Sequence, residues 1–328
     1  MITSRTPYRI SFFGGGTDYP DWYLNHGGSV FSSTIDKFCY ISTKFSTNLL
    51  EIRHKIVWSY IEYVQSFNDI LHPVVREGLK YLNFDNNQGI EIYHSGDLPA
   101  RTGIGTSSSF SVGLINALSN LNNKPLDKHH LALKAIELEQ KILNETVGSQ
   151  DQIAASYGGF NKIKFNTNGK IVVDKINLDL KTQKLLNSNI SVYYMGTRIG
   201  RNSSEIVSDM LLNIDSKYQI LKELESYVDI GINLIIKHDF IEFGKLIDES
   251  WKIKKSLGTK ITNSNIDEIY NIGLKNGAYG GKVLGAGGAG FIMFIIPEEK
   301  KEILRQKLPN CAELSFEFEN QGSIIISN

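Results

Sequence analysis

The sequence predicts an α+β fold with two lobes. Its 328 residues, 41% of them apolar, are enough to bury the cores of two domains. Strand-like segments dominate up to residue 94, and helical periodicity begins after residue 107. Strand-like segments then return near residues 160, 190 and 290, so both halves of the chain mix helix and sheet.

The first half begins with extended segments. β-Branched and aromatic residues predict strands over residues 9–13, 29–35, 39–45 and 89–94. A helix is predicted from residue 108 to 121, because Phe110, Leu114 and Leu118 recur on one face until two asparagines break the pattern. A second helix is predicted to begin near Asp127.

The second half follows a predicted hairpin. Asn168 and Gly169 form a turn signal between two short strands of residues 158–177. Later segments predict strands over residues 190–195, 290–296 and 323–326, and helices over residues 203–212, 217–237, 240–257 and 267–276. We expect a domain boundary soon after the hairpin, giving domains 1–178 and 179–328.

Composition excludes several function classes. Lys plus Arg equals Asp plus Glu at 35 each, so no basic surplus favours a nucleic acid or a membrane as partner. Cys39 and Cys311 lack metal or redox spacing and are expected to be buried apolar residues. The amino terminus lacks a signal-peptide core, so a cytoplasmic location is expected. No oligomeric state is predicted.

The segment LPARTGIGTSSSF, residues 98–110, indicates a phosphate-binding loop. Gly103 and Gly105 permit close backbone approach, and the predicted helix start supplies free amides and a positive dipole end. An ordinary glycine-serine turn before a capped helix is the alternative. The predicted nucleotide-binding residues are Pro99, Gly103, Ile104, Gly105, Thr106, Ser107, Ser108 and Ser109.

Other phosphate-binding motifs are absent or stand in the wrong structural context. The sequence contains no GxxxxGK[ST] string and no HRD or DFG series, which argues against P-loop ATPases and protein kinases. GAGGAG, residues 285–290, matches GxGxxG, but a strand-like FIMFII follows where a dinucleotide fold needs a helix. A nicotinamide or flavin site is therefore not favoured.

Three separate segments resemble one family. PYRISFFGGGTDYP (residues 7–20), PARTGIGTSSS (99–109) and GGKVLGAGGAGFIMF (280–294) are similar, in order and spacing, to the three signature motifs of the GHMP kinases. Ile104, Thr106 and Ala289 depart mildly from the family pattern. The resemblance implies ATP and Mg²⁺ as cofactors. It also implies a ribosomal protein S5-like N-terminal domain, a ferredoxin-like C-terminal domain, and an active site between them.

Within that family, GGGTDYP, VGSQDQ, YGGFN and WKIKKSL resemble the sugar-kinase subgroup that acts on heptose 7-phosphate. This resemblance implies a small-molecule sugar phosphate as substrate. Its anomeric hydroxyl would be phosphorylated, giving the 1,7-bisphosphate for nucleotide-activated heptose synthesis. Another acceptor, such as galactose, fucose, homoserine or a mevalonate-type alcohol, is an alternative. A catalytically silent sensor of ATP and sugar is a second alternative.

The resemblance also assigns catalytic roles. Asp151 would accept or orient the hydroxyl proton, although an Asp here could instead cap a helix beginning at Gln152. Arg9 would stabilise charge on the transferring group and keep Asp151 ionised. Ser108 and Glu139 are expected to bind magnesium, although an acidic residue on a helix is often only solvated.

The acceptor side carries further expectations. Asp18 would hydrogen bond sugar hydroxyls beside a close backbone turn, and arginines would hold the distal phosphate unless they are merely solvated. Gly285, Gly287 and Gly288 are expected to form a turn packed against the phosphate loop, and Trp58 is a candidate adenine contact. The full predicted acceptor set is Gly14, Gly15, Gly16, Thr17, Asp18, Arg101, Arg198, Arg201, Gly287 and Gly288.

Overall fold

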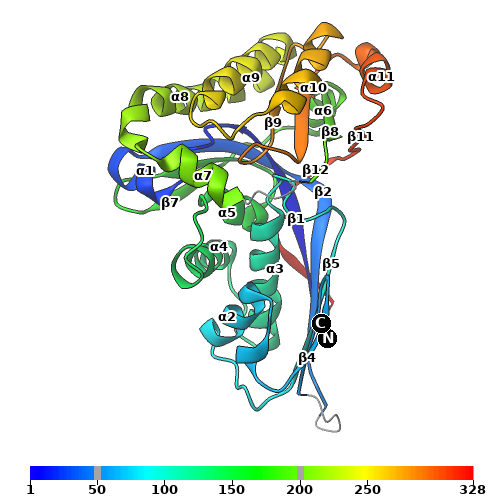
Figure 1. Cartoon of the computed structure of the whole chain (residues 1–328). Helices are drawn as coiled ribbons and strands as arrows, with labels where there is room; N and C mark the ends of the chain where they lie inside the picture. The colour runs from blue at the N-terminus through cyan, green and yellow to red at the C-terminus, as the bar shows by residue number, and fades with distance from the viewer. Residues whose placement is uncertain (48–52, 198–202, 328) are drawn as a thin grey trace.

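The protein folds around two antiparallel-rich sheets, as a computed structural model describing residues 1–47, 53–197 and 203–327 shows. In Figure 1 the longer sheet stands edge-on with α2, α3 and α4 on one side, and the helices of the second half gather at its upper end. Within the described residues this sheet has nine strands and the second sheet has four. The predicted α+β fold, in which both halves of the chain mix helix and sheet, is confirmed.

The longer sheet is organised by β1 (Ile2–Phe13) and β2 (Gly28–Phe45), which pair antiparallel along their length. The prediction of two separate strands over residues 29–35 and 39–45 is wrong. Asp36 and Lys37 form a bulge within one continuous strand. Pro7 pairs with Phe38, and the next residue of β1 pairs with Ile35. On either side of the bulge, β2 pairs with β5 (Ile90–Gly96) or β6 (Phe160–Phe165).

The remaining strands of this sheet lie at its edges. The hairpin predicted at Asn168 and Gly169 is confirmed, since β6 pairs antiparallel with β7 (Ile171–Lys175). The sequence did not predict β3 (His54–Val57) and β4 (Ile61–Val64), which are only four residues long. Two late strands, β12 (Phe318–Glu319) and β13 (Ile324–Ser327), pair with β2 and β1.

The second sheet has the antiparallel order β11–β8–β10–β9. Its strands are β8 (Ile190–Tyr194), β9 (Gly280–Val283), β10 (Phe291–Ile295) and β11 (Ala312–Glu313). Because β12 and β13 return to the first sheet, residues after 178 contribute to both sheets. The boundary after residue 178 stays a prediction.

Helices cover both sheets. Those of the first half are α1 (Pro20–His26), α2 (Pro73–Tyr81), α3 (Thr106–Leu121), α4 (Lys128–Glu137) and α5 (Gln150–Tyr157), with a 3₁₀ turn over Phe67–Asp69 and a π turn over Leu138–Ile142. Those of the second half are α6 (Leu180–Ser188), α7 (Ser203–Leu211), α8 (Tyr218–Ile236), α9 (Phe240–Lys255), α10 (Ser264–Lys275) and α11 (Glu298–Lys307), with a 3₁₀ turn over Ile214–Lys217. The predicted helix near Asp127 is confirmed, and Asp127 caps α4 by accepting from the His130 amide. The sequence missed α1, α2, α6 and α11; in α11 only Leu304 is buried, so no apolar repeat marks it.

Helices α8 and α9 join the two halves. A Cβ atom on Gly231 of α8 would stand 2.2 Å from the Phe13 ring of β1, so only glycine allows this approach. Phe243 of α9 packs edge-on against Phe13, with ring centroids 5.5 Å apart. These contacts fix the end of β1 beside the second half of the chain.

Two further expectations concern single features. Both cysteines are free; Cys39 is buried as expected, whereas Cys311 is only half-buried. No helix in the described ranges combines the length and apolar character needed to cross a bilayer.

Candidate active site

A cleft of about 540 Å³ opens where the end of β1 meets the second half. Its walls come from β1 and the turn after it, the loop before α3, the start of α5, and α7, α9 and β9. The predicted site residues that line it are Arg9, Gly15, Gly16, Asp18, Arg101, Gly103, Gly105, Thr106, Ser107, Ser108 and Asp151.

Other predicted site residues do not line the cleft. Ser109 donates its hydroxyl to the Pro7 carbonyl at 2.8 Å, and Thr17 donates to the Gly14 carbonyl at 2.8 Å, so both hydroxyls serve packing. Arg198 and Arg201 lie outside the described residues. The other predicted residues that do not line the cleft are Gly14, Pro99, Ile104, Glu139, Gly287 and Gly288.

The loop before α3 has the backbone that its glycines predict. Gly103 and Gly105 take φ values of +84° and +77°, and Gly105 directly precedes the first residue of α3. The Arg9 amide donates to the Ile104 carbonyl at 3.0 Å, which ties the loop to β1. The amides at the start of α3 therefore face a cleft in which an anion could accept their hydrogen bonds.

A glycine-rich turn after β9 supports this loop. A Cβ on Gly285 would lie 2.6 Å from the Gly103 Cα, and one on Gly290 would lie 2.1 Å from the Thr102 carbonyl oxygen. Gly287, in contrast, faces Ile261. The contact predicted for Gly285 is therefore confirmed, Gly287 does not make it, and Gly290 makes a contact that was not predicted.

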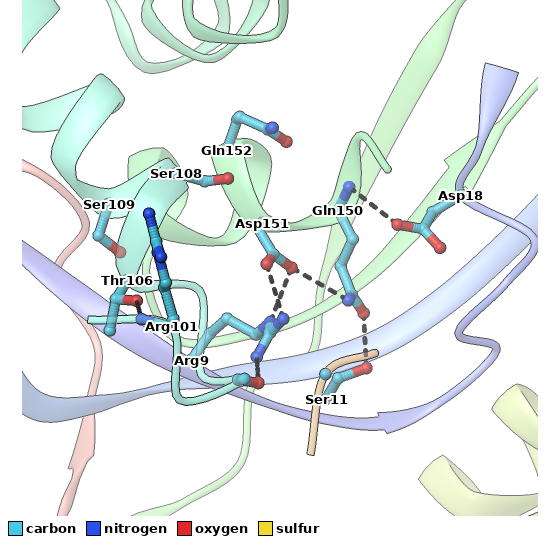
Figure 2. A network of polar contacts seen from close by, with 12 residues as sticks. Arg9, Ser11, Asp18, Arg101, Thr106, Ser108, Ser109, Gln150, Asp151 and Gln152 are labelled. Carbon is cyan, nitrogen blue, oxygen red and sulfur yellow. Dashed lines mark hydrogen bonds and ion pairs between the residues drawn. The ribbon is translucent and has the colours of Figure 1, made fainter. Parts of the chain in front are cut away.

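Arg9 and Asp151 form a bidentate ion pair at the centre of the cleft (Figure 2). Arg9 Nε donates to Asp151 Oδ1 at 2.7 Å and Nη2 donates to Oδ2 at 2.6 Å, while Nη1 donates to the Gly103 carbonyl at 2.7 Å. The Arg9 side chain is 4% exposed and that of Asp151 is 23% exposed. The pair thus links β1, the phosphate loop and α5.

Asp151 is not the cap of its helix. Helix α5 begins at Gln150 with Ser149 as its cap residue, so Asp151 lies inside the first turn. Gln150 also donates to Asp151 Oδ1, at 3.3 Å. Within the described residues, Oδ2 accepts one hydrogen bond only, from Arg9, and keeps a lone pair for a ligand.

Asp18 lies behind the acceptor side of the cleft. Its Oδ1 accepts from the Gly16 amide at 3.1 Å and its Oδ2 from the Gln150 amide at 3.4 Å. Burial, followed by the charge of Asp151, raises the pKa of Asp18, and these backbone hydrogen bonds oppose the rise. A Cβ on Gly148 would stand 1.9 Å from Asp18 Oδ2, so this glycine, which the sequence did not mark individually, makes room for the carboxyl.

Ser108 and Glu139 meet beneath the start of α3. Ser108 Oγ donates to Glu139 Oε2 at 3.0 Å, and Gln152 Nε2 donates to the same oxygen at 2.5 Å. Glu139 lies on the π turn that follows α4 and is fully buried. Burial raises its pKa to about 7, against the hydrogen bonds from Ser111, Gln152 and Ser108.

This arrangement fits a magnesium site completed by phosphate. Glu139 Oε1 is buried without a hydrogen bond of ordinary geometry, so one carboxylate oxygen is available near Ser108. The described residues contain no group of three or more His, Cys, Asp or Glu side chains that could hold a metal by themselves. Magnesium commonly takes one or two protein oxygens and completes its shell with phosphate and water.

Trp58 lies apart from the cleft. Its Nε1 donates to Glu62 Oε1 at 2.6 Å, and its ring contacts His72, which stacks on Phe110 of α3. Trp58 is therefore linked to the start of α3 through two rings. An adenine contact by Trp58 stays a prediction.

Two buried lysines on the cleft wall were not predicted from the sequence as site residues. Lys254 of α9 and Lys282 of β9 line the cleft and are 8% and 4% exposed. A sequence signal was present, because Lys282 is the one charged residue in the otherwise apolar and glycine-rich run of residues 280–296. Lys254 lies in the WKIKKSL segment, where helical position alone does not separate it from its solvated neighbours.

Comparison with protein families agrees with this geometry. The model of the GHMP kinases N terminal domain matches residues 69–159, and the model of the GHMP kinases C terminal matches residues 232–313. The first match spans the phosphate loop and Asp151. The second spans Lys254 and the glycine-rich turn after β9.

Individual relatives match nearly the whole chain. A D-glycero-alpha-D-manno-heptose 7-phosphate kinase of Campylobacter jejuni is 27% identical over 96% of both chains. A mevalonate kinase of Methanocaldococcus jannaschii is 30% identical over 71% of this chain and 70% of its own. The crystal structure of a D-glycero-D-manno-heptose 1-phosphate kinase from Bacteriodes thetaiotaomicron matches with a TM-score of 0.82 and 23% identity, covering 100% of this chain and 99% of that one.

Proposed function

We propose that this chain, which belongs to the GHMP kinase family of ATP-dependent small-molecule phosphotransferases, phosphorylates the anomeric hydroxyl of D-glycero-D-manno-heptose 7-phosphate. The product would be heptose 1,7-bisphosphate for nucleotide-activated heptose synthesis. The observation that carries this proposal is the Arg9–Asp151 pair, which faces the cleft beside the phosphate loop.

The proposed roles follow from the demands of phosphoryl transfer, which needs positioning and charge neutralisation more than covalent help from the protein. The amides at the start of α3, with the hydroxyls of Ser107 and Ser108, would bind the nucleotide's phosphates. GHMP kinases use ATP and Mg²⁺. Bound magnesium supplies charge neutralisation between the phosphates, and Ser108 and Glu139 would hold it.

Asp151 would receive the proton of the acceptor. As the anomeric oxygen bonds to the γ-phosphorus and the bond from that phosphorus to ADP breaks, the hydroxyl proton passes to Asp151 Oδ2, the oxygen with a free lone pair. Arg9 holds the carboxylate in place through two hydrogen bonds and adds positive charge near the transferring group. Asp18 would hydrogen bond a sugar hydroxyl on the side of Gly15 and Gly16.

The choice of acceptor is supported by the relative named a heptose 7-phosphate kinase, at 27% identity over 96% of both chains. The structural match at 23% identity supports the fold alone. Within the same proposal, residues 1–178 form the nucleotide-binding domain and residues 179–328 the second domain, with a cytoplasmic location.

A substrate panel tests the proposal. The purified protein is assayed with ATP and magnesium against heptose 7-phosphate, heptose 1-phosphate, galactose, fucose, homoserine and mevalonate. We expect heptose 7-phosphate to give the highest kcat/KM, with the new phosphate on the anomeric oxygen by NMR. A higher kcat/KM for another acceptor would identify that acceptor as the substrate instead. Binding of ATP and sugar without turnover would favour the alternative of a catalytically silent sensor.

A further inference from the structure

The cleft contains positive charge that the proposed mechanism does not use. Besides the Arg9–Asp151 ion pair, the side chains of Lys254 and Lys282 are buried on the same wall. Burying an ammonium group is costly unless it is compensated by an anion or by several hydrogen bonds. The two lysines therefore require a physical explanation.

Lys282 is incompletely satisfied. Its Nζ donates to the Phe12 carbonyl at 2.7 Å, and within the described part of the chain it has no other hydrogen bond partner and no ion-pair partner. An ammonium group carries three donors, so two remain for a ligand. Burial, and then the charges of Lys254 and Arg9, lower its pKa.

Lys254 connects the two lysines to both the nucleotide side and the acceptor side of the cleft. Its Nζ donates at 2.6 Å to the carbonyl of Gly285, the residue that packs against Gly103 of the phosphate loop. Leu257, three residues further along the chain, approaches Gly16 of the acceptor turn. Lys254 is thus connected at once to the nucleotide side and to the acceptor side.

A purely structural role explains these lysines poorly. A tie between β9 and the Phe12 carbonyl needs one hydrogen bond donor and no charge. The charge of Lys254 opposes protonation of Lys282, since it lowers the pKa of that residue. A doubly charged phosphate would offset this repulsion and accept the two remaining donors of Lys282.

We propose that Lys254 and Lys282 form an anion subsite that binds a phosphate group of a substrate inside the cleft. The inference rests on the proposed kinase function and deepens it. The γ-phosphate of ATP and the acceptor's own phosphate share this chemistry. The acceptor's phosphate is the favoured ligand, because the loop before α3 already offers amides and hydroxyls to the nucleotide.

The test uses Lys254→Met and Lys282→Met, which keep length and remove charge. Lys252→Met is the matched control, since Lys252 lies on the same helix α9 with a 63% exposed side chain and pairs with Asp248. Calorimetric titrations of each full-length protein use four probes: heptose 7-phosphate, the unphosphorylated heptose, magnesium AMP-PNP and inorganic phosphate. Thermal unfolding checks that each variant is folded.

We expect either substitution to weaken binding of heptose 7-phosphate and inorganic phosphate by roughly tenfold or more, the effect of one charge-assisted hydrogen bond. Binding of the unphosphorylated heptose and of AMP-PNP should stay within about twofold, as should every affinity of Lys252→Met. Weakened AMP-PNP binding instead would assign the subsite to the nucleotide's γ-phosphate. Unchanged affinities for heptose 7-phosphate, inorganic phosphate and AMP-PNP would overturn the proposal.

The outcome is separable from failure of the proposed substrate. If the unsubstituted protein does not bind heptose 7-phosphate, the acceptor is wrong, and the inorganic phosphate and AMP-PNP titrations still decide whether the lysines bind an anion. If Lys282→Met does not fold, the titrations of Lys254→Met decide whether the subsite binds an anion. Lys254 lies on a helix and does not join the two sheets, so this variant is expected to fold.

Discussion

At the scale of single residues, hydrogen bonding determines which atom of Asp151 can act. Arg9 and Gln150 both donate to Oδ1, whereas among residues 1–47, 53–197 and 203–327 Arg9 is the one donor to Oδ2. An acceptor hydroxyl can therefore reach only one of the two oxygens without displacing a donor. A lysine in place of Arg9 would lack the planar fork that fixes this geometry.

A second residue-scale consequence concerns His72, which stacks on Phe110 of α3 with ring centroids 4.6 Å apart. Burial lowers the pKa of His72 to about 4, with a further contribution from the charge of His94, against an ordinary value of 6.5. Below pH 6.5 the unfolded chain binds the proton first, so this residue makes stability fall as pH drops from 6.5 towards 4.

The corresponding prediction is that His72→Phe reduces the acid sensitivity of the protein while keeping the stacked ring. Between pH 7 and pH 4.5 the variant should lose on the order of 1–2 kcal/mol less unfolding free energy than the unsubstituted protein, a figure reduced for partial solvent screening. Urea unfolding at the two pH values measures this difference. An identical pH response in both proteins would show that His72 titrates normally.

At the scale of elements, the sequence predicted what depends on local backbone chemistry. Gly103 and Gly105 stand where positive φ is required, and Asp127 caps α4, because both features depend on a few adjacent residues. Lys254 and Lys282 were missed because they come from a helix and a strand whose meeting depends on packing between distant segments. The bulge in β2 escaped prediction for a related reason, since two polar residues resemble a turn unless the pairing with β1 is known.

The phosphate loop yields a prediction at this scale. Gly103→Ala puts a Cβ 2.4 Å from the Leu284 carbonyl oxygen at a φ of +84°, so the loop must move away from the turn after β9. We expect at least a tenfold loss of AMP-PNP affinity, on the order of 1.4 kcal/mol, measured by calorimetry.

Gly169→Ala is the matched control. Gly169 has a similar φ of +79° in the β6–β7 hairpin, but its added Cβ meets only Leu24 Cδ2, at 3.9 Å. Backbone strain of about 1 kcal/mol should lower the stability of the control without changing nucleotide binding. Equal AMP-PNP affinity in the two variants would mean that the contact between loop and turn does not shape the site.

At the scale of the whole molecule, the last two strands pair with the first two strands of the chain. Ser323, just before β13, accepts one hydrogen bond from Asn116 of α3, and its hydroxyl lies 2.8 Å from that of Thr6 of β1. The first strand and the last described strand consequently lie side by side, with Thr3 of β1 paired with Ser327 of β13 (Figure 1). The first sheet is therefore incomplete without the last residues of the chain.

This pairing predicts that a fragment of residues 1–178 does not reach the stability of the full chain. The fragment lacks β12 and β13 and exposes Phe13, which α8 and α9 cover. Circular dichroism during heating should show a broad transition at lower temperature than that of the full chain. A sharp transition at the temperature of the full chain would show that residues 1–178 fold independently.

The central claim, that Asp151 receives the acceptor's proton within a cleft built by both halves, is tested most directly by single-turnover kinetics of Asp151→Asn with ATP, magnesium and heptose 7-phosphate. Asp21→Asn is the control, because Asp21 is also the second residue of its helix, α1, but is exposed. The account predicts a rate at least about a hundredfold lower for Asp151→Asn, with AMP-PNP affinity nearly unchanged and Asp21→Asn fully active. A near-normal rate for Asp151→Asn would contradict it.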